Sequence, residues 1–130
     1  MIKQNYQKIL NKLITNSFAE LEDYKIYILE KRIKPKAMVK YYPWARVILV
    51  NSKVRKAYSI PAFKGLLAHE LGHFKIFKQN NWGWFNVSLD YIHYLLSPAY
   101  KREVENEVEK IVIKKGFKKQ RDLSHNIKLK

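Results

Sequence analysis

The sequence predicts one α+β domain, in which a small β-sheet packs on a motif-bearing helix and on a later, glutamate-bearing helix. Runs of β-branched and aromatic residues at 25–30 and 39–50 predict strands. Helical patterns surround a histidine motif at 69–73 and continue over 99–115. At 130 residues the chain is long enough for one modest core. We therefore expect residues 1–130 to form a single domain.

Composition narrows the class of protein. Hydrophobic residues make up 47% and aromatic residues 14% of the chain, which indicates a folded protein. The chain contains no cysteine, so it has no disulfide framework. No run approaches the ~20 apolar residues that span a bilayer, and lysines interrupt the N-terminal apolar residues, unlike a signal peptide. We expect a cytoplasmic protein without a transmembrane segment.

The chain is strongly basic. It has 26 basic and 11 acidic residues, a net charge of +15. Such a field attracts nucleic acid, anionic membrane surfaces or acidic partners. No nucleic-acid-binding motif accompanies the charge, so a lysine-rich but ordinary surface is the simpler interpretation. Nucleic acid or an anionic surface remains a candidate partner.

The first half of the chain supplies a helix and strands. Residues 4–22 carry apolar residues at helical spacing and predict an amphipathic helix. Residues 25–30 predict a strand. Pro43 divides the β region at 39–50, whose second part, residues 46–50, predicts another strand. That strand is either an ordinary core strand or a sheet edge whose free N–H and C=O groups could hold an extended peptide.

The central helix is predicted by its two ends. Ser59 suits the N-cap and Pro61 the first turn. Apolar residues then continue beyond the motif as far as Phe77, and Asn80-Asn81 predicts the end of the helix.

Within this helix, His69-Glu70-Leu71-Gly72-His73 spells H-E-x-x-H. Histidines four residues apart leave the same helix face. Two imidazole nitrogens can then reach one tetrahedral Zn²⁺ at roughly 2.0–2.1 Å each. Glu70 lies one step round the helix, where it can take a proton from a metal-activated water. The alternative is a coincidental pair of helix histidines, which would have to be buried without a partner.

The next segment offers fewer functional signals. Residues 82–85 form an aromatic loop that either lines a pocket or fills the core. A short helix over 88–96 ends at Ser97-Pro98. His93 lies within it among tyrosines and is expected to pack there and not to bind metal.

The helix predicted over 99–115 supplies the missing ligand. A catalytic zinc takes three protein ligands and keeps one open position. We expect Glu105 to complete the set, and Glu109, one turn later, to accept the N–H of a zinc-bound histidine. An acidic surface stripe is the alternative for both residues. Gly116 is expected to end the helix.

These motifs resemble those of the gluzincin metallopeptidases. H-E-L-G-H at 69–73 is followed by E-N-E-V-E at 105–109, as in the catalytic domains of membrane-embedded prenyl-protein and heat-shock peptidases. The chain is also similar to the soluble minigluzincins. The second motif differs from the family pattern at two positions: Val108 occupies the position of a small residue, and Glu109 that of Asp. The resemblance implies an α/β domain whose strand at 46–50 is the substrate-binding edge.

The predicted function is that of a zinc-dependent endopeptidase acting on peptide or protein substrates, with Glu70 as general base. Two alternatives remain open. One is a zinc-fold module without peptidase activity, whose basic surface binds nucleic acid or another macromolecule. The other is a regulatory peptidase that cleaves a DNA-bound repressor, since such enzymes also carry H-E-L-G-H.

The C-terminal residues 118–130 have two competing roles. Apolar residues alternate with polar ones there, which predicts an extended segment that could lie along the strand at 46–50 and cover the cleft. The resemblance implies the same, because C-terminal segments can keep minigluzincins latent. Alternatively the tail is mobile, or His125 is a catalytic residue that stabilises the oxyanion. Tyr91, Tyr94 and Tyr100 are less specific candidates for that role. His125 and His93 are also substitutes for Glu105 as third ligand.

Overall fold

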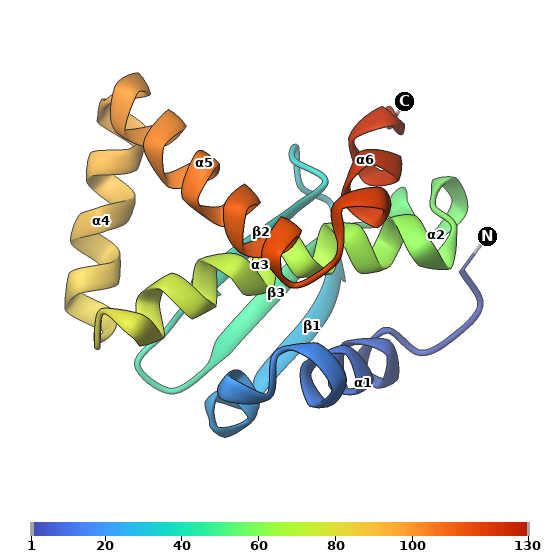
Figure 1. The fold of residues 1–130 in the computed structure, drawn as a ribbon, viewed down its shortest axis with the longest axis horizontal. Helices are drawn as coiled ribbons and strands as arrows, with labels where there is room; N and C mark the ends of the chain where they lie inside the picture. The colour runs from blue at the N-terminus through green and yellow to red at the C-terminus, as the bar shows by residue number, and fades with distance from the viewer. Residues whose placement is uncertain (1, 130) are drawn as a thin grey trace.

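The computed structural model describes residues 2–129, and Figure 1 shows an α+β domain with a three-stranded mixed sheet and a set of helices, as predicted. The elements in chain order are α1 (Tyr6–Ser17), the 3₁₀ turn η1 (Ala19–Tyr24), β1 (Ile26–Lys31), β2 (Ala37–Tyr41), β3 (Arg46–Asn51), α2 (Val54–Ala57), α3 (Ile60–Gln79), α4 (Trp84–Leu96), α5 (Pro98–Lys114) and α6 (Lys118–Asn126).

The sheet has the strand order β1-β3-β2, with β1 parallel and β2 antiparallel to β3. The prediction that residues 46–50 form the substrate-binding edge is therefore wrong, because β3 is the central strand. Residues 47–51 are buried without alternation, which is typical of a strand with neighbours on both sides. Among residues 2–129, β2 is the edge strand beside the motif helix, and its outer edge is unpaired.

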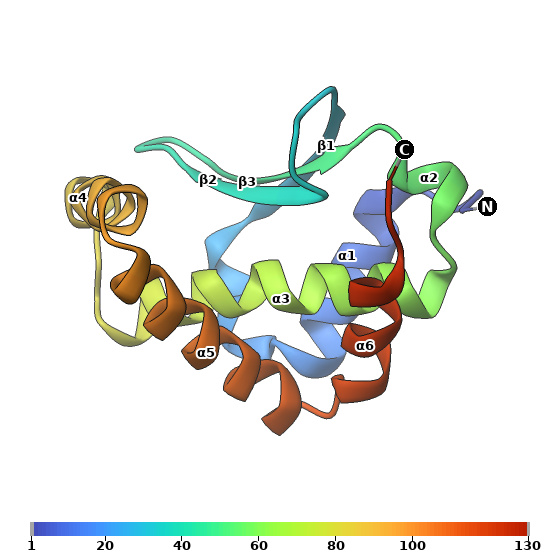
Figure 2. The ribbon, with the colours of Figure 1, turned by 90° about the horizontal axis from the view of Figure 1, so that it is seen from above.

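The motif helix α3 runs through the middle of the molecule. The sheet lies along one side of it, α5 and α6 along another, α1 behind it, and α4 across its C-terminal end (Figures 1 and 2). Its caps agree with the sequence: the Ser59 hydroxyl accepts from the Ala62 N–H, and Asn81, at φ 53°, ends the helix. α3 is buried along most of its length, and His73 is the motif residue that stays partly exposed.

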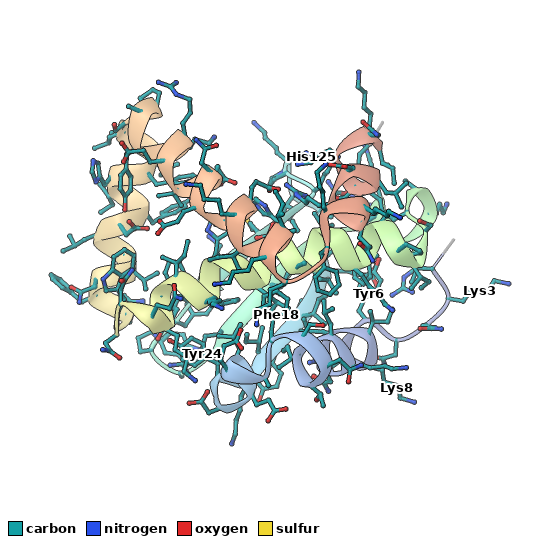
Figure 3. The ribbon with its side chains drawn as sticks, viewed as in Figure 1. Lys3, Tyr6, Lys8, Phe18, Tyr24 and His125 are labelled. Carbon is teal, nitrogen blue, oxygen red and sulfur yellow. The ribbon has the colours of Figure 1, made fainter. Side chains whose placement is uncertain are left out.

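The amphipathic helix at the N-terminus is shorter than predicted. It ends at Ser17, and residues 19–24 continue as the 3₁₀ turn. Its apolar face packs on α3, with Tyr6 stacked on Phe63 at 4.4 Å between ring centroids. Figure 3 shows Lys3 and Lys8 pointing away from the molecule on the other side. The predicted role in core packing is confirmed.

The C-terminal residues form a helix, so the predicted extended segment is wrong. Phe117, Arg121 and Ser124 are buried at helical spacing, and α6 packs against α3. The alternating apolar residues do not share one face of a strand, which is why the prediction failed. Leu123 is exposed on the helix, whereas Ile127 and Leu129 pack on the core after the helix ends. Gly116, at φ 90°, separates α5 from α6 as expected of a helix stop.

Among residues 2–129, no helix combines the length and the apolar character needed to cross a membrane.

The contact between α3 and α6 depends on Gly65. A Cβ atom there would lie 2.2 Å from the backbone oxygen of Gln120, a clash that only movement of the helix could relieve. We predict that Gly65→Ala lowers the free energy of unfolding by about 1–3 kcal/mol or more through overpacking. Gly83→Ala is the matched control, because a Cβ there meets nothing within 4 Å. Urea unfolding of both variants measures the difference, and equal stability would contradict the close packing of α6.

Candidate metal centre

Three side chains from two helices meet between α3 and α5. His69 and His73 leave the same face of α3, and α5 brings Glu105 opposite them. Nε2 of His69 lies 3.1 Å from Oε2 of Glu105, and Nε2 of His73 lies 3.6 Å from Oε1 of Glu105. One ligand atom from each residue lies within 4.8 Å of the other two, so the cluster could hold a metal ion.

The spacing of the donors fits a tetrahedral ion. Ligands at ~2.0–2.1 Å from such an ion lie roughly 3.3–3.4 Å from one another. The two distances to Glu105, 3.1 and 3.6 Å, fall on either side of this value. Two imidazoles and a carboxylate are a donor set that zinc and several other divalent metals accept.

Glu109 fixes the orientation of His69. Its Oε1 lies 2.8 Å from Nδ1 of His69, on the ring edge away from Glu105. With the proton on Nδ1 donated to Glu109, the lone pair of Nε2 faces the cluster. This is the contact expected of Glu109, and the longer side chain of Glu reaches it without difficulty.

Arg121 is the residue of this site that the sequence analysis missed. From α6 its Nε donates to Oε1 of Glu109 at 2.9 Å, and the side chain is almost fully buried. Its Nη1 also donates to the hydroxyl of Ser124, which contacts Tyr58. The helical spacing of residues 117, 121 and 124 could have indicated a buried helix face that includes Arg121. The alternation of apolar and polar residues at 123–129 favoured a strand instead. The arginine ties α6 to the carboxylate that orients His69.

The ionisation of the cluster suits a cation. Burial would raise the pKa of Glu105, but hydrogen bonds from His69 and Tyr94 outweigh it and lower the pKa to about 2. Burial would also raise the pKa of Glu109, but interactions with His69 and Arg121 outweigh it and lower the pKa of this carboxyl to about 2. Burial and the neighbouring His69 lower the pKa of His73 to about 4. The site thus holds two carboxylates and one imidazole with an available lone pair.

His69 behaves differently from His73. Burial would lower its pKa, yet the hydrogen bonds to Glu105 and Glu109 raise the pKa to about 9. The two carboxylates thus favour a positive charge beside them, which a bound cation would also supply.

The cluster opens into a cleft of about 520 Å³. All five residues of β2, 37–41, line one wall, so the backbone edge of this strand faces the cleft. Glu70 lines the floor next to His69, and burial raises its pKa. The walls contributed by α4 and α5 are mainly apolar or aromatic; they include Tyr91, Tyr94, Leu95 and Val104.

Tyr94 is the tyrosine that contacts the cluster. From α4 its hydroxyl donates to Oε1 of Glu105. Tyr91 lines the cleft without this bond, and Tyr100 donates to Asp90. His93 stacks on Tyr100 with ring centroids 3.9 Å apart, so the prediction that it packs and does not join the cluster agrees with the structure.

His125 does not reach the metal cluster. Its Nε2 lies 3.9 Å from Oε1 of Glu109, and more than half of its side chain is exposed. Figure 3 shows it on the side of α6 that faces α5. No described residue after Phe117 lines the cleft, so the expectation that the tail covers the cleft is wrong. The reason is that α6 packs against α3 through Gly65.

The aromatic segment at 82–85 does not line the cleft either. Trp82 stacks on Phe77 at 6.0 Å and packs against the core, while Trp84 and Phe85 begin α4 and are exposed. The alternative of core filling therefore holds for Trp82 alone.

No family model matches the chain, and no curated protein does. The structure shows a small α+β domain in which buried His69 and partly buried His73 and Glu105 form a triad that could bind a metal ion.

We predict that the intact protein binds zinc. His69→Ala, His73→Ala and Glu105→Ala should each weaken the zinc affinity by more than about 100-fold. This exceeds the loss of up to about 100-fold that is typical when a residue contacting a metal ligand is changed. Competition with a chromogenic chelator measures the affinity. His93→Ala is the matched control, because this histidine lies outside the cluster. If Glu105→Ala bound zinc as tightly as the parent, the third ligand would be elsewhere.

Proposed function

We propose that the protein is a zinc-dependent endopeptidase of the minimal gluzincin type. The observation that supports this most strongly is the juxtaposition of the triad with Glu70, all four residues lining one cleft or meeting at it. A purely structural zinc site is closed by four protein ligands, whereas three ligands at an open cleft leave a position for chemistry.

His69, His73 and Glu105 would hold the metal. Zn²⁺ bound there would act as a Lewis acid that polarises a water and the carbonyl of the peptide bond. Glu70 would act as general base on the attacking water and pass the proton to the leaving amine. Its environment suits this role, because burial raises the pKa of its carboxyl toward the range in which it can both accept and release a proton.

The substrate would bind as an extended strand along β2. Among residues 2–129, β2 pairs with β3 alone, and its other edge faces the cleft. Backbone N–H and C=O groups there can pair with any peptide, independently of its side chains. Apolar substrate side chains would then meet the wall that Tyr91, Leu95 and Val104 form.

Tyr94 is the donor that we propose for the oxyanion. It lines the cleft, and its hydroxyl already lies at the carboxylate of Glu105, next to the position of the ion. His125, the residue considered from the sequence, lies beside Glu109 and away from the cleft lining. We therefore assign His125 no contact with substrate.

Glu70→Gln separates catalysis from metal binding. The amide keeps the shape of the side chain but cannot take a proton, so we predict that hydrolysis falls by about 10²–10⁴-fold while zinc affinity is retained. Cleavage of a denatured protein substrate, followed by gel and mass spectrometry with and without chelator, measures activity. A parent protein that is loaded with zinc and cleaves nothing would overturn the proposed function.

Tyr94→Phe tests the donor. Loss of one preorganised oxyanion donor costs about 10²–10³-fold in kcat, so we predict a fall in this range with little change in KM. Zinc content is measured alongside, because Tyr94 also contacts Glu105. His125→Ala is the companion variant and should retain most of its activity. The opposite result, with His125→Ala inactive and Tyr94→Phe active, would return the role to His125.

A further inference from the structure

Helix α4 exposes an unusual amount of apolar surface. Val87 is its one buried residue. Seven of its large apolar side chains are between 46% and 79% exposed: Trp84, Phe85, Leu89, Tyr91, Ile92, Leu95 and Leu96. Single exposed apolar residues are common in proteins, but a contiguous set of this size usually marks an interaction site.

Most of the exposed residues fall on two neighbouring faces of the helix. Tyr91, Ile92 and Leu95 line the cleft, whereas Trp84, at the first turn, does not. Phe85, Leu89, Ile92 and Leu96 recur at i, i+4, i+7 and i+11, and therefore fall within about 60° of one another around the helix axis. We call these four residues the outer stripe. Each is more than half exposed. Ile92 lies at the margin of the cleft, and the other three do not line it.

The connection between β2 and β3 extends this apolar surface. In both views it lies beside the N-terminal end of α4 (Figures 1 and 2). It carries Trp44, which is 79% exposed and stacks on Tyr42 with ring centroids 5.4 Å apart. A tryptophan held in this way at a loop tip suits the boundary between lipid and water.

Basic side chains lie beside α4, two of them at the mouth of the cleft. Nζ of Lys40 lies 5.9 Å from the ring centre of Tyr91, and Nζ of Lys101 lies 5.5 Å from that of Tyr94. Arg102 follows at the start of α5 and is exposed. The single acidic residue of α4, Asp90, accepts a hydrogen bond from Tyr100. An exposed apolar helix face on a chain with a net charge of +15 is complementary to an anionic lipid surface.

We propose that the outer stripe and Trp44 dock the protein on the surface of a membrane that contains anionic lipids, with α4 lying in the interface. Lipid is favoured over a second copy of this chain, because each copy carries a net charge of +15 and two such copies repel. The excess of basic side chains, which includes the exposed Arg102 beside α4, would instead favour contact with lipid phosphates. This docking does not depend on hydrolysis.

The test is co-sedimentation of the full chain with vesicles. We expect binding to mixed phosphatidylcholine and phosphatidylglycerol vesicles, weaker binding as salt rises, and little binding to phosphatidylcholine alone. Leu89→Gln and Leu96→Gln should each weaken vesicle binding by about tenfold, because each variant loses the free energy gained when one large apolar side chain leaves water. Trp44→Ser tests the hairpin separately from the helix and should also weaken it. Circular dichroism checks that each variant is folded.

Ile113→Gln and Leu123→Gln are matched controls, because their side chains are 51% and 48% exposed but lie on α5 and α6. They should bind vesicles like the parent. Glu70→Gln should do so too, which separates this proposal from the proposed enzyme activity. Failure to bind the anionic vesicles, or equal binding by the stripe variants and the parent, would overturn the proposal. A dimer in light scattering that Leu89→Gln dissociates would overturn it in favour of a second copy.

Discussion

The hydrogen bond between Nδ1 of His69 and Glu109 is the contact on which the site depends. It joins α3 to α5, and Arg121 extends it to α6 by donating to the same carboxylate oxygen. Largely buried charges are costly unless they are paired and hydrogen-bonded, and here each member has a partner. The network sets the ring of His69 so that Nε2 faces Glu105. Without it, two histidines on one helix face would not present a fixed pair of donors.

The close approach of these helices depends on small residues of α3. A Cβ at Gly72 would lie 2.9 Å from Cγ1 of Val108, and one at Gly65 would meet the backbone of α6. Gly72 lies inside the histidine motif, so the same turn of helix that supplies His69 and His73 also admits α5. Val108 is fully buried against it, between the two glutamates of α5 that serve the site. Helix packing and the geometry of the candidate metal site are thus coupled through one turn of α3.

Helix α4 contributes to two surfaces. Its inner face carries Tyr94 to Glu105 and closes the cleft opposite β2. The residues of its outer stripe are each more than half exposed. A helix needs an apolar partner along at least one face to remain folded in water, and α4 has few such contacts. A lipid surface on the outside and a peptide in the cleft would both add to the apolar contacts that hold it.

The sequence by itself determined the local features. Ser59, Asn80-Asn81 and Gly116 set the ends of helices because capping is a short-range effect. The spacing of His69 and His73, and of Glu105 and Glu109, places each pair on one helix face, and the cluster was predictable from that. Only the tertiary structure decided which strand is the edge, since β2 and β3 have similar residues and their order depends on long-range pairing. It also decided the tail: Arg121 stabilises α6 through Glu109, a partner 12 residues away that no local pattern indicates.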